Sequence, residues 1–227
     1  MGVKAILFDI DDTLFPSSEF AEKARRNAIA AMVEEGLERS ADEAYAALES
    51  IIRKYGSNYP RHFDALLDRL GVKENRARLI AAGVAAYHNT KGTIAPFPDV
   101  PKTLVRLRDL GYRLYAVSEG KAVKQWDKLI RLGLDFFFHG AFISEELGCG
   151  KSVRFYRAVT RKLVLKPGEL LMVGDRLDKD VVPAKKAGMR AVRVLQGKYA
   201  SQAAGKTRPD FEITRVGELL GVLKQLG

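Results

Sequence analysis

A continuous apolar run near the start of the chain ends abruptly in carboxylates. Residues 3–14 read V-K-A-I-L-F-D-I-D-D-T-L, so Asp9, Asp11 and Asp12 follow the apolar residues directly. A run of this composition is typical of a strand buried on both faces, as in a parallel sheet between two layers of helices. Ligands of such sheets bind at the carboxyl ends of the strands, so the aspartates lie where chemistry is expected.

The spacing of Asp9 and Asp11 fits a cation site. Side chains two residues apart on a strand point to the same side of the sheet, roughly 6 to 7 Å apart. Both carboxylates are expected to be ionised at neutral pH, and they repel each other unless a cation lies between them. A hard ion such as Mg²⁺ suits oxygen ligands of this kind. A D-x-D motif alone fits a solvated acidic loop equally well, so the rest of the chain must decide.

Strand and helix patterns alternate through the second half of the chain. Strands are predicted at 112–118, 141–144, 170–174 and 190–195, and helices at 104–110, 122–132, 152–163 and 182–187. Each helix connects two strands, which predicts a parallel sheet that the first strand must also join. The fold class is therefore α/β, with a doubly wound parallel sheet.

The segment between the first strand and this alternation reads as helices only. Its apolar residues recur at spacings of three and four, and Ser40 followed by Glu43 resembles a capping box. We therefore predict a small helical domain, residues 16–95, inserted into an α/β core formed by 1–15 and 96–227. Three prolines mark the end of the inserted segment: Pro96, Pro98 and Pro101.

Two further strands end in polar residues at the same predicted edge of the sheet. One ends in V-S-E-G, with Ser118 and Glu119, whose backbone N–H groups could hold an anionic oxygen. The other ends in V-G-D-R-L-D-K-D, which supplies Asp175 and, about one helical turn later, Asp180. Together with Asp9 and Asp11, these residues form a site of four or more carboxylates, and their mutual repulsion strongly favours a bound cation. Between the two strands, Lys151 precedes a helix and could serve as a point charge against phosphate.

Length and hydropathy favour a folded protein of the cytoplasm. The chain has 227 residues, of which 47% are hydrophobic, enough for a substantial core. It contains no apolar run of the length that spans a bilayer, and its start lacks the pattern of a signal peptide. We therefore expect a cytoplasmic protein without a membrane association.

The net charge of +10 raises the question of nucleic-acid binding. Residues 16–95 carry 12 Lys and Arg against 11 Asp and Glu, so most of the excess lies outside them. Basic residues spaced three or four apart on a predicted helix usually form a solvated face, and no aromatic residues alternate with them, which disfavours nucleic-acid binding. The basic residues in question are Lys121, Lys124, Lys128, Arg131, Arg154, Arg157, Arg161 and Lys162.

Taken together, the strand ends resemble the four motifs of the haloacid dehalogenase superfamily, in the family's order and over nearly the whole chain. The stretch D-I-D-D-T-L resembles the first motif, V-S-E-G the second, G-K-S the third, and G-D-R-L-D-K-D the fourth. The second is the loosest, because Glu119 stands where the family more often has Asn or Gly. The resemblance implies a Rossmann-like core and a helical cap, which excludes water and selects the leaving group.

The resemblance implies a phosphatase that works through an aspartyl-phosphate intermediate on a small soluble phosphorylated metabolite. Asp9 would be the nucleophile and Asp11 the general acid and base. Mg²⁺ would be held by the carboxylates of Asp9 and Asp175 and the backbone carbonyl of Asp11, with Asp180 supporting the ion or reaching it through water. Ser118, the N–H of Glu119 and Lys151 would bind the phosphoryl oxygens. Guesses for substrate contacts near the cap are Phe15, Glu19, Phe20 and Arg61.

Several alternatives stay open at this point. A dehalogenase is disfavoured, because such enzymes lack the second aspartate of the first motif and Asp11 is present. A phosphotransferase or phosphomutase of the same superfamily is the main alternative. A phospho-acceptor module of the receiver type, without catalysis, is less favoured, because receivers lack a helical insert after the first strand. A nucleic-acid-binding protein that keeps the fold would bind in a steeply salt-dependent way. A homodimer through an apolar cap face is also open.

Overall fold

In a computed structural model, which describes residues 2–203 and 205–226, the α/β part of the chain is built on one parallel sheet. The described residues form six strands in the order β3-β2-β1-β4-β5-β6, and every neighbouring pair is parallel. The strands are β1 (Ala5–Phe8), β2 (Arg113–Ser118), β3 (Ala141–Ile143), β4 (Leu170–Gly174), β5 (Arg190–Val194) and β6 (Phe211–Ile213). The strand order reverses between β1 and β4, so the prediction of a doubly wound α/β sheet is confirmed.

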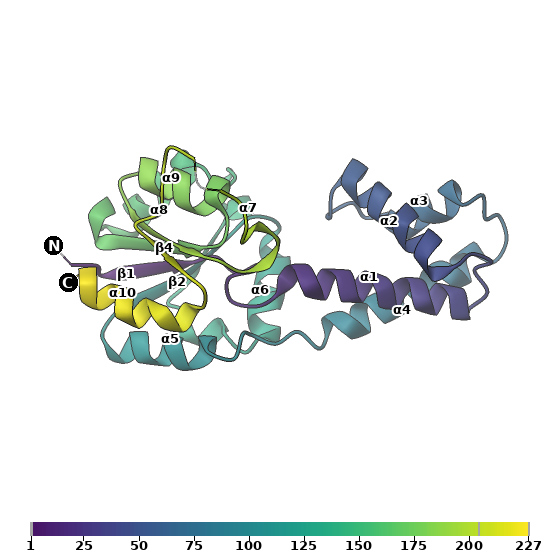
Figure 1. The fold of residues 1–227 in the computed structure, drawn as a ribbon, viewed down its shortest axis with the longest axis horizontal. Helices are drawn as coiled ribbons and strands as arrows, with labels where there is room; N and C mark the ends of the chain where they lie inside the picture. Colours follow the sequence, from purple (N-terminus) through teal and green to yellow (C-terminus); the bar gives the residue numbers. More distant parts are fainter. Residues whose placement is uncertain (1, 204, 227) are drawn as a thin grey trace. The chain divides into compact units, whose positions relative to one another are not determined.

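Helices cover both faces of this sheet (Figure 1). They are α5 (Val100–Asp109), α6 (Ala122–Arg131), α7 (Ser144–Leu147), α8 (Val153–Leu163), α9 (Val182–Lys186) and α10 (Leu219–Leu226). Helices α8 and α9 lie on one side of the sheet, and α5 and α10 on the other. The side chains of β1 alternate accordingly: Ala5 and Leu7 belong to the core cluster that contains Phe155 and Tyr156 of α8. Burial on both faces explains why β1 is apolar throughout.

The chain divides into two compact units, Met1–Ser18 with Ala95–Gly227, and Glu19–Ile94. The second unit has a hydrophobic core of its own, which includes Met32, Leu48 and Leu66. Its helices are α1 (Ser17–Glu34), which begins in the first unit, α2 (Ala41–Tyr55), α3 (His62–Arg69) and α4 (Arg76–Lys91). The predicted capping box at the start of α2 is present, because Glu43 N–H donates to Ser40 Oγ and Ser40 N–H donates to the Glu43 carboxylate.

Two features of the α/β unit differ from the sequence-based expectation. Helix α5 begins at Val100 rather than at residue 104, and Pro101 lies in its first turn. Proline is tolerated there because the first N–H groups of a helix have no partner within it. Strand β6 and the helices α7 and α10 were not predicted at all. A strand of three residues at the sheet edge has too short a pattern to recognise in sequence.

Among the residues that the structure describes, no helix is both long and apolar enough to cross a membrane.

Candidate active site

The central strands bring three carboxylates together at the carboxyl edge of the sheet. Asp9 follows β1 and Asp175 follows β4, and these neighbouring strands are joined there by a hydrogen bond from Asp9 N–H to the Val173 carbonyl (2.9 Å). Asp180 joins them from the turn after β4. One carboxylate oxygen of each aspartate lies within 4.8 Å of the others, and all three side chains are buried. The predicted residues Asp9, Asp175 and Asp180 therefore form one cluster.

A turn of π-helix, Leu177–Val181, directs Asp180 back toward the strand end. The backbone N–H of Arg176 donates to Asp180 Oδ2 at 3.0 Å and holds the carboxylate in this orientation. A Cβ atom at Gly174 would overlap the Asp180 carboxylate. The glycine at the end of β4 is therefore required by the close approach of Asp180 to the backbone.

Among the described residues, Lys151 supplies the positively charged side chain that contacts the carboxylate cluster. It lies in the loop before α8 and is itself buried. Its ammonium group donates to Asp9 Oδ1 and, at 2.6 Å, to Asp180 Oδ1. Burial alone would lower the pKa of the Lys151 ammonium, but the charges of Asp180 and Asp9 outweigh it and raise the pKa above its ordinary value. Lys151 therefore stays charged.

One lysine does not balance three buried carboxylates. Burial, the charge of Asp180 and the charge of Asp11 raise the pKa of Asp9 to about 7, against the opposing effect of Lys151. Burial, followed by the charges of Asp9 and Asp180, raises the pKa of Asp175 to about 9. In addition, Asp175 Oδ1 is buried and has no hydrogen-bond partner among the described residues. A cluster of carboxylates with a free oxygen fits a hard divalent cation such as Mg²⁺.

Ser118 and Glu119 lie at the end of β2, beside this cluster. Ser118 is buried, and its hydroxyl donates to Gln125 Oε1 at 3.1 Å, while Gln125 Nε2 donates to the Glu119 carbonyl at 3.2 Å. Gln125, in the first turns of α6, was not singled out in the sequence. Its position about one turn into the helix that follows a strand end is the signal that could have found it. Gln125 thus fixes the loop that carries both predicted residues.

The Glu119 carboxylate connects this loop to two others. It forms an ion pair with Lys179 at 3.0 Å, in the turn that carries Asp180. A Cβ atom at Gly150, next to Lys151, would overlap the Glu119 carboxylate. The side chain of Glu119 is therefore occupied by protein contacts.

Asp11 lies apart from the three clustered carboxylates. Its side chain is half exposed, and both of its oxygens accept from Lys128 Nζ of α6 at 2.6 Å. The prediction that Lys128 belongs to a solvated helix face is wrong, because its side chain is only 17% exposed and reaches back to the strand end. Helical spacing predicts the face of α6 on which Lys128 lies. It does not predict which residue of another element contacts that face.

Asp12 has a structural role that the sequence pattern did not reveal. Its buried carboxylate accepts from Ser17 Oγ at 3.0 Å and from Ser18 N–H at 2.8 Å, and it also bonds the Ser18 hydroxyl. Asp12 adopts a left-handed backbone conformation, with φ of 54°. It therefore fixes the start of α1, where free N–H groups favour a carboxylate.

Gly197 provides a test of this packing. Its φ is +64°, and an added Cβ atom would lie 2.5 Å from the Cβ of Asp12. We expect Gly197→Ala to lower the free energy of unfolding by roughly 2–4 kcal/mol, from left-handed strain and overpacking together. Urea unfolding followed by circular dichroism measures this. Gly148→Ala is the matched control, because Gly148 has the same φ of +64° and nothing within 4 Å. Equal losses in both variants would show that the Asp12 contact contributes nothing.

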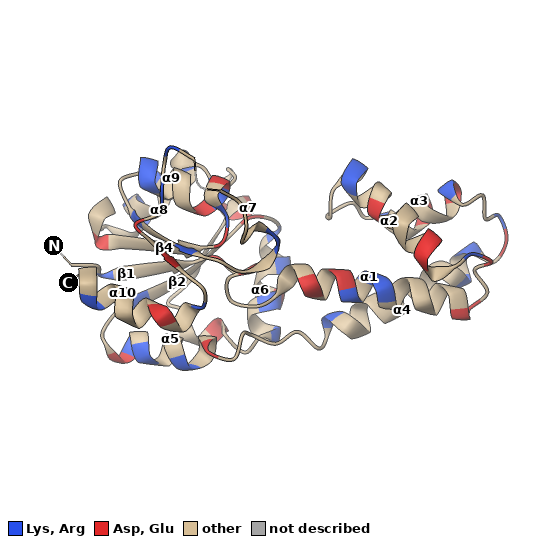
Figure 2. Ribbon diagram, in the orientation of Figure 1, with Lys and Arg blue, Asp and Glu red and all other residues tan. Residues whose placement is uncertain are grey.

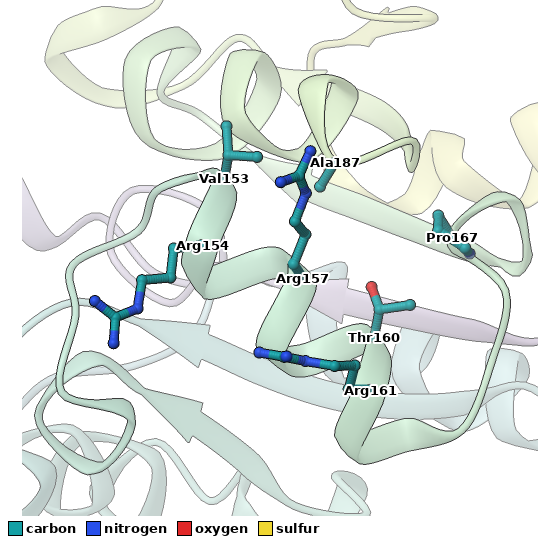
Figure 3. A pocket seen from close by; sticks show the side chains of 7 residues that line it. All are labelled: Val153, Arg154, Arg157, Thr160, Arg161, Pro167 and Ala187. Atoms are coloured by element: carbon teal, nitrogen blue, oxygen red, sulfur yellow. The ribbon is translucent and has the colours of Figure 1, made fainter.

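The predicted basic face of α8 is exposed, as expected, and lines a cavity of about 510 Å³. Figure 3 shows that Arg157 points toward Ala187, while Arg154 and Arg161 point elsewhere. The cavity shares no residue with the carboxylate cluster. Figure 2 shows Lys and Arg on several other helices of the α/β unit, α5 and α6 among them. The positive charge of the chain is therefore spread over the unit rather than gathered at the candidate site.

Comparison with known proteins agrees with the resemblance that the sequence motifs indicate. Residues 3–188 match the sequence model of the haloacid dehalogenase-like hydrolases. The chain is 51% identical to a protein of Methanopyrus kandleri named glyceraldehyde 3-phosphate phosphatase, over 99% of this chain and 98% of that one. It is 42% identical to a protein of the same name from Methanocaldococcus jannaschii, over 99% and 98% of the two chains.

Solved structures agree on the fold. The structure of the Bacillus subtilis protein YfnB, described as bound to magnesium, matches 98% of this chain and 99% of its own, with a TM-score of 0.69 and 20% identity. At that identity the likeness shows the fold alone. The assignment of the family and of phosphatase activity rests on the match to the family's sequence model and on the identity to the two phosphatase relatives. The chain belongs to the haloacid dehalogenase-like hydrolase family and is a phosphatase of that family.

Proposed function

We propose that this phosphatase hydrolyses glyceraldehyde 3-phosphate in a magnesium-dependent reaction. The observation that carries the proposal is the 51% identity to the Methanopyrus kandleri phosphatase of that name, which extends over nearly the full length of both chains. A similarity of this extent includes every segment that contributes to the candidate site. The substrate would be a small phosphomonoester.

The proposed reaction begins at Asp9. A carboxylate oxygen of Asp9 attacks the phosphorus atom, and the bond from phosphorus to the ester oxygen breaks, giving an aspartyl phosphate. Asp11 gives its proton to the leaving ester oxygen. It then takes a proton from a water molecule whose oxygen attacks the same phosphorus atom. The bond to Asp9 breaks, which releases inorganic phosphate and restores the carboxylate.

The carboxylate cluster supports a magnesium site. Asp9 and Asp175 would hold Mg²⁺ through their carboxylates and Asp11 through its backbone carbonyl, while Asp180 would support the ion or reach it through water. The unpartnered Asp175 Oδ1 and the excess of buried carboxylate over lysine fit a cation there. Bound Mg²⁺ would neutralise charge on the phosphoryl oxygens and so lower the barrier to transfer.

The remaining predicted residues would bind the transferred group. Lys151 lies against Asp9, so its ammonium would offset charge on the phosphoryl oxygens as the bond to Asp9 forms. Ser118 and the backbone N–H of Glu119 would donate to the same oxygens. Because Gln125 and Lys179 hold the loop of Ser118 and Glu119 in place, these donors would need little rearrangement.

The helical segment 16–95 would act as a cap that excludes water and selects the leaving group. It contains a compact unit with its own core, Glu19–Ile94, as expected of a domain that moves as a body. Of the guessed substrate contacts, Phe15 is buried in the α/β unit, and Arg61 is exposed and pairs with Asp64. Glu19 and Phe20 lie in the first turn of α1. These four positions stay predictions.

The test is phosphate release from glyceraldehyde 3-phosphate and from 3-phosphoglycerate, which has the same carbon skeleton with a carboxylate in place of the aldehyde. We expect kcat/KM to be at least about tenfold higher for the aldehyde, a difference of about 1.4 kcal/mol. Triose phosphates also lose phosphate spontaneously, so the rate without enzyme is subtracted. Equal or reversed preference between the two substrates would contradict the proposed substrate.

Removal of metal tests the cation site separately. We expect EDTA to lower the rate at least about 100-fold, because a bound cation is worth several kcal/mol of charge stabilisation in the transition state. Added Mg²⁺ in excess of the chelator is expected to restore the rate. A rate that EDTA leaves unchanged would refute the metal requirement without affecting the choice of substrate.

A further inference from the structure

Outside the carboxylate cluster, Asp11 forms an ion pair with Lys128 in which one ammonium group contacts both carboxylate oxygens. Lys128 Nζ lies 2.6 Å from both carboxylate oxygens of Asp11. Its side chain is 17% exposed, whereas that of Lys121 at the start of the same helix is 71% exposed and pairs with Glu145 on the surface. Lys128 is therefore drawn out of solvent toward the end of β1.

Both partners of this pair are attached to fixed backbone. Asp11 is joined to Phe15 by a β-bridge, and the N–H of Leu14 bonds to the carbonyl of Ile10 at 3.0 Å, so the loop that carries Asp11 is closed on itself. On the other side, the neighbouring Leu129 is fully buried and anchors α6. The Lys128 ammonium also lies 6.0 Å from the centroid of the buried Phe15 ring. The pair therefore joins two rigid elements.

We propose that Lys128 is a positioning residue, which holds the Asp11 carboxylate in the orientation in which it exchanges a proton with the leaving oxygen and with water. This inference rests on the role proposed above for Asp11. A half-exposed aspartate that has no partner rotates freely about its two side-chain bonds, whereas contact with both oxygens fixes the plane of the carboxylate.

The test uses the wild type, Lys128→Met and Lys128→Arg with two substrates that differ in leaving group. The ester oxygen of glyceraldehyde 3-phosphate needs a proton to leave, whereas p-nitrophenolate leaves readily without one. The parameter kcat/KM reports only the steps up to departure of the leaving group. It therefore shows whether Lys128 contributes to a reaction whose leaving oxygen needs a proton and to one whose leaving oxygen does not. General acid catalysis is typically worth 10²- to 10⁴-fold, and misplacing the acid removes part of that.

For Lys128→Met we expect kcat/KM to fall about 10- to 100-fold with glyceraldehyde 3-phosphate and less than about threefold with p-nitrophenyl phosphate. We expect kcat to fall with both substrates, because hydrolysis of the aspartyl phosphate also requires Asp11. Lys128→Arg keeps the charge and two donors, so it is expected to recover at least part of the loss. Lys121→Met is the matched control, because it removes a lysine–carboxylate pair from the exposed end of α6; both parameters are expected to stay at wild-type values.

Three outcomes would overturn the inference. Unchanged or increased kcat in Lys128→Met would show that Asp11 needs no partner or is held back by it. An equal fall of kcat/KM with both substrates would show that Lys128 acts on the phosphoryl group or on the fold. A loss in KM alone would make Lys128 a substrate contact. If instead the wild type hydrolyses neither substrate, it is the proposed function that fails.

Discussion

Replacing Asp9 by asparagine is expected to abolish phosphate release, with a loss of at least about 10⁴-fold in kcat. The amide is nearly the same size but cannot form the aspartyl phosphate, and no other carboxylate lies equally close to the Lys151 ammonium and the end of β1 among the described residues. A loss of that size corresponds to about 5.4 kcal/mol in the barrier. Phosphate release in the presence of Mg²⁺, measured over hours against a blank without enzyme, gives the rate.

The control for Asp9→Asn is Asp127→Asn, on the exposed side of α6, where the aspartate pairs with Arg131 at 2.8 Å. It makes the same chemical change at a partly exposed pair outside the carboxylate cluster and is expected to leave kcat within about twofold of the wild type, as for surface substitutions in general. Circular dichroism spectra of both variants establish that they are folded. An Asp9→Asn protein that is folded and retains even one-tenth of the wild-type activity would eliminate Asp9 as the nucleophile.

Replacing Lys151 by methionine is expected to remove activity and also to destabilise the α/β unit, by about 3–5 kcal/mol in the absence of metal. The methionine fills a similar volume but leaves the buried Asp9 and Asp180 carboxylates without the ammonium that both now bond. An uncompensated buried charge costs far more than the loss of a surface pair. Urea unfolding in EDTA, followed by circular dichroism, measures the free energy of unfolding.

Two further variants define the origin of the Lys151→Met effect. Lys179→Met breaks the more exposed pair with Glu119 and is expected to cost less than about 1 kcal/mol. Adding Asp180→Asn to Lys151→Met removes one of the uncompensated charges, so the double variant is expected to be more stable than Lys151→Met alone. If Lys151→Met loses no more stability than Lys179→Met, the buried cluster is not held together by charge.

The fold was largely predictable because its signals are local. Strands β1 and β4 are short apolar runs, β2 and β5 are mainly apolar, and the helices between them bury one apolar face, so the alternation is visible without any knowledge of contacts. The elements that were missed carry weak signals. Strand β6 has three residues, and Pro101, which lies in the first turn of α5, suggested a helix start later than the one at Val100.

The residues of the candidate site likewise divide into those whose position follows from strand topology and those that depend on contacts of long side chains. The sequence predicted that Asp9, Asp175 and Ser118 lie at one edge because parallel strands end at a common edge, so residues far apart in sequence are placed together by topology alone. Gln125, Lys128 and Lys179 were not found as partners, because each contact depends on the direction of a long side chain from a helix or turn toward another element.

The amino-acid sequence by itself determined the doubly wound sheet, the helical character of the segment after the first strand and the strand ends at which Asp9 and Asp175 lie, because periodicity and strand direction are properties of the chain. It also predicted that the Asp11 side chain faces the same site as Asp9, whereas in the structure Asp11 lies apart and pairs with Lys128. Only the tertiary structure decided how those carboxylates are compensated. It assigns Lys151 to Asp9 and Asp180, Lys128 to Asp11, and Asp12 to the start of α1. Charge pairing depends on distances of a few ångströms between separate elements, and no pattern along the chain encodes such distances.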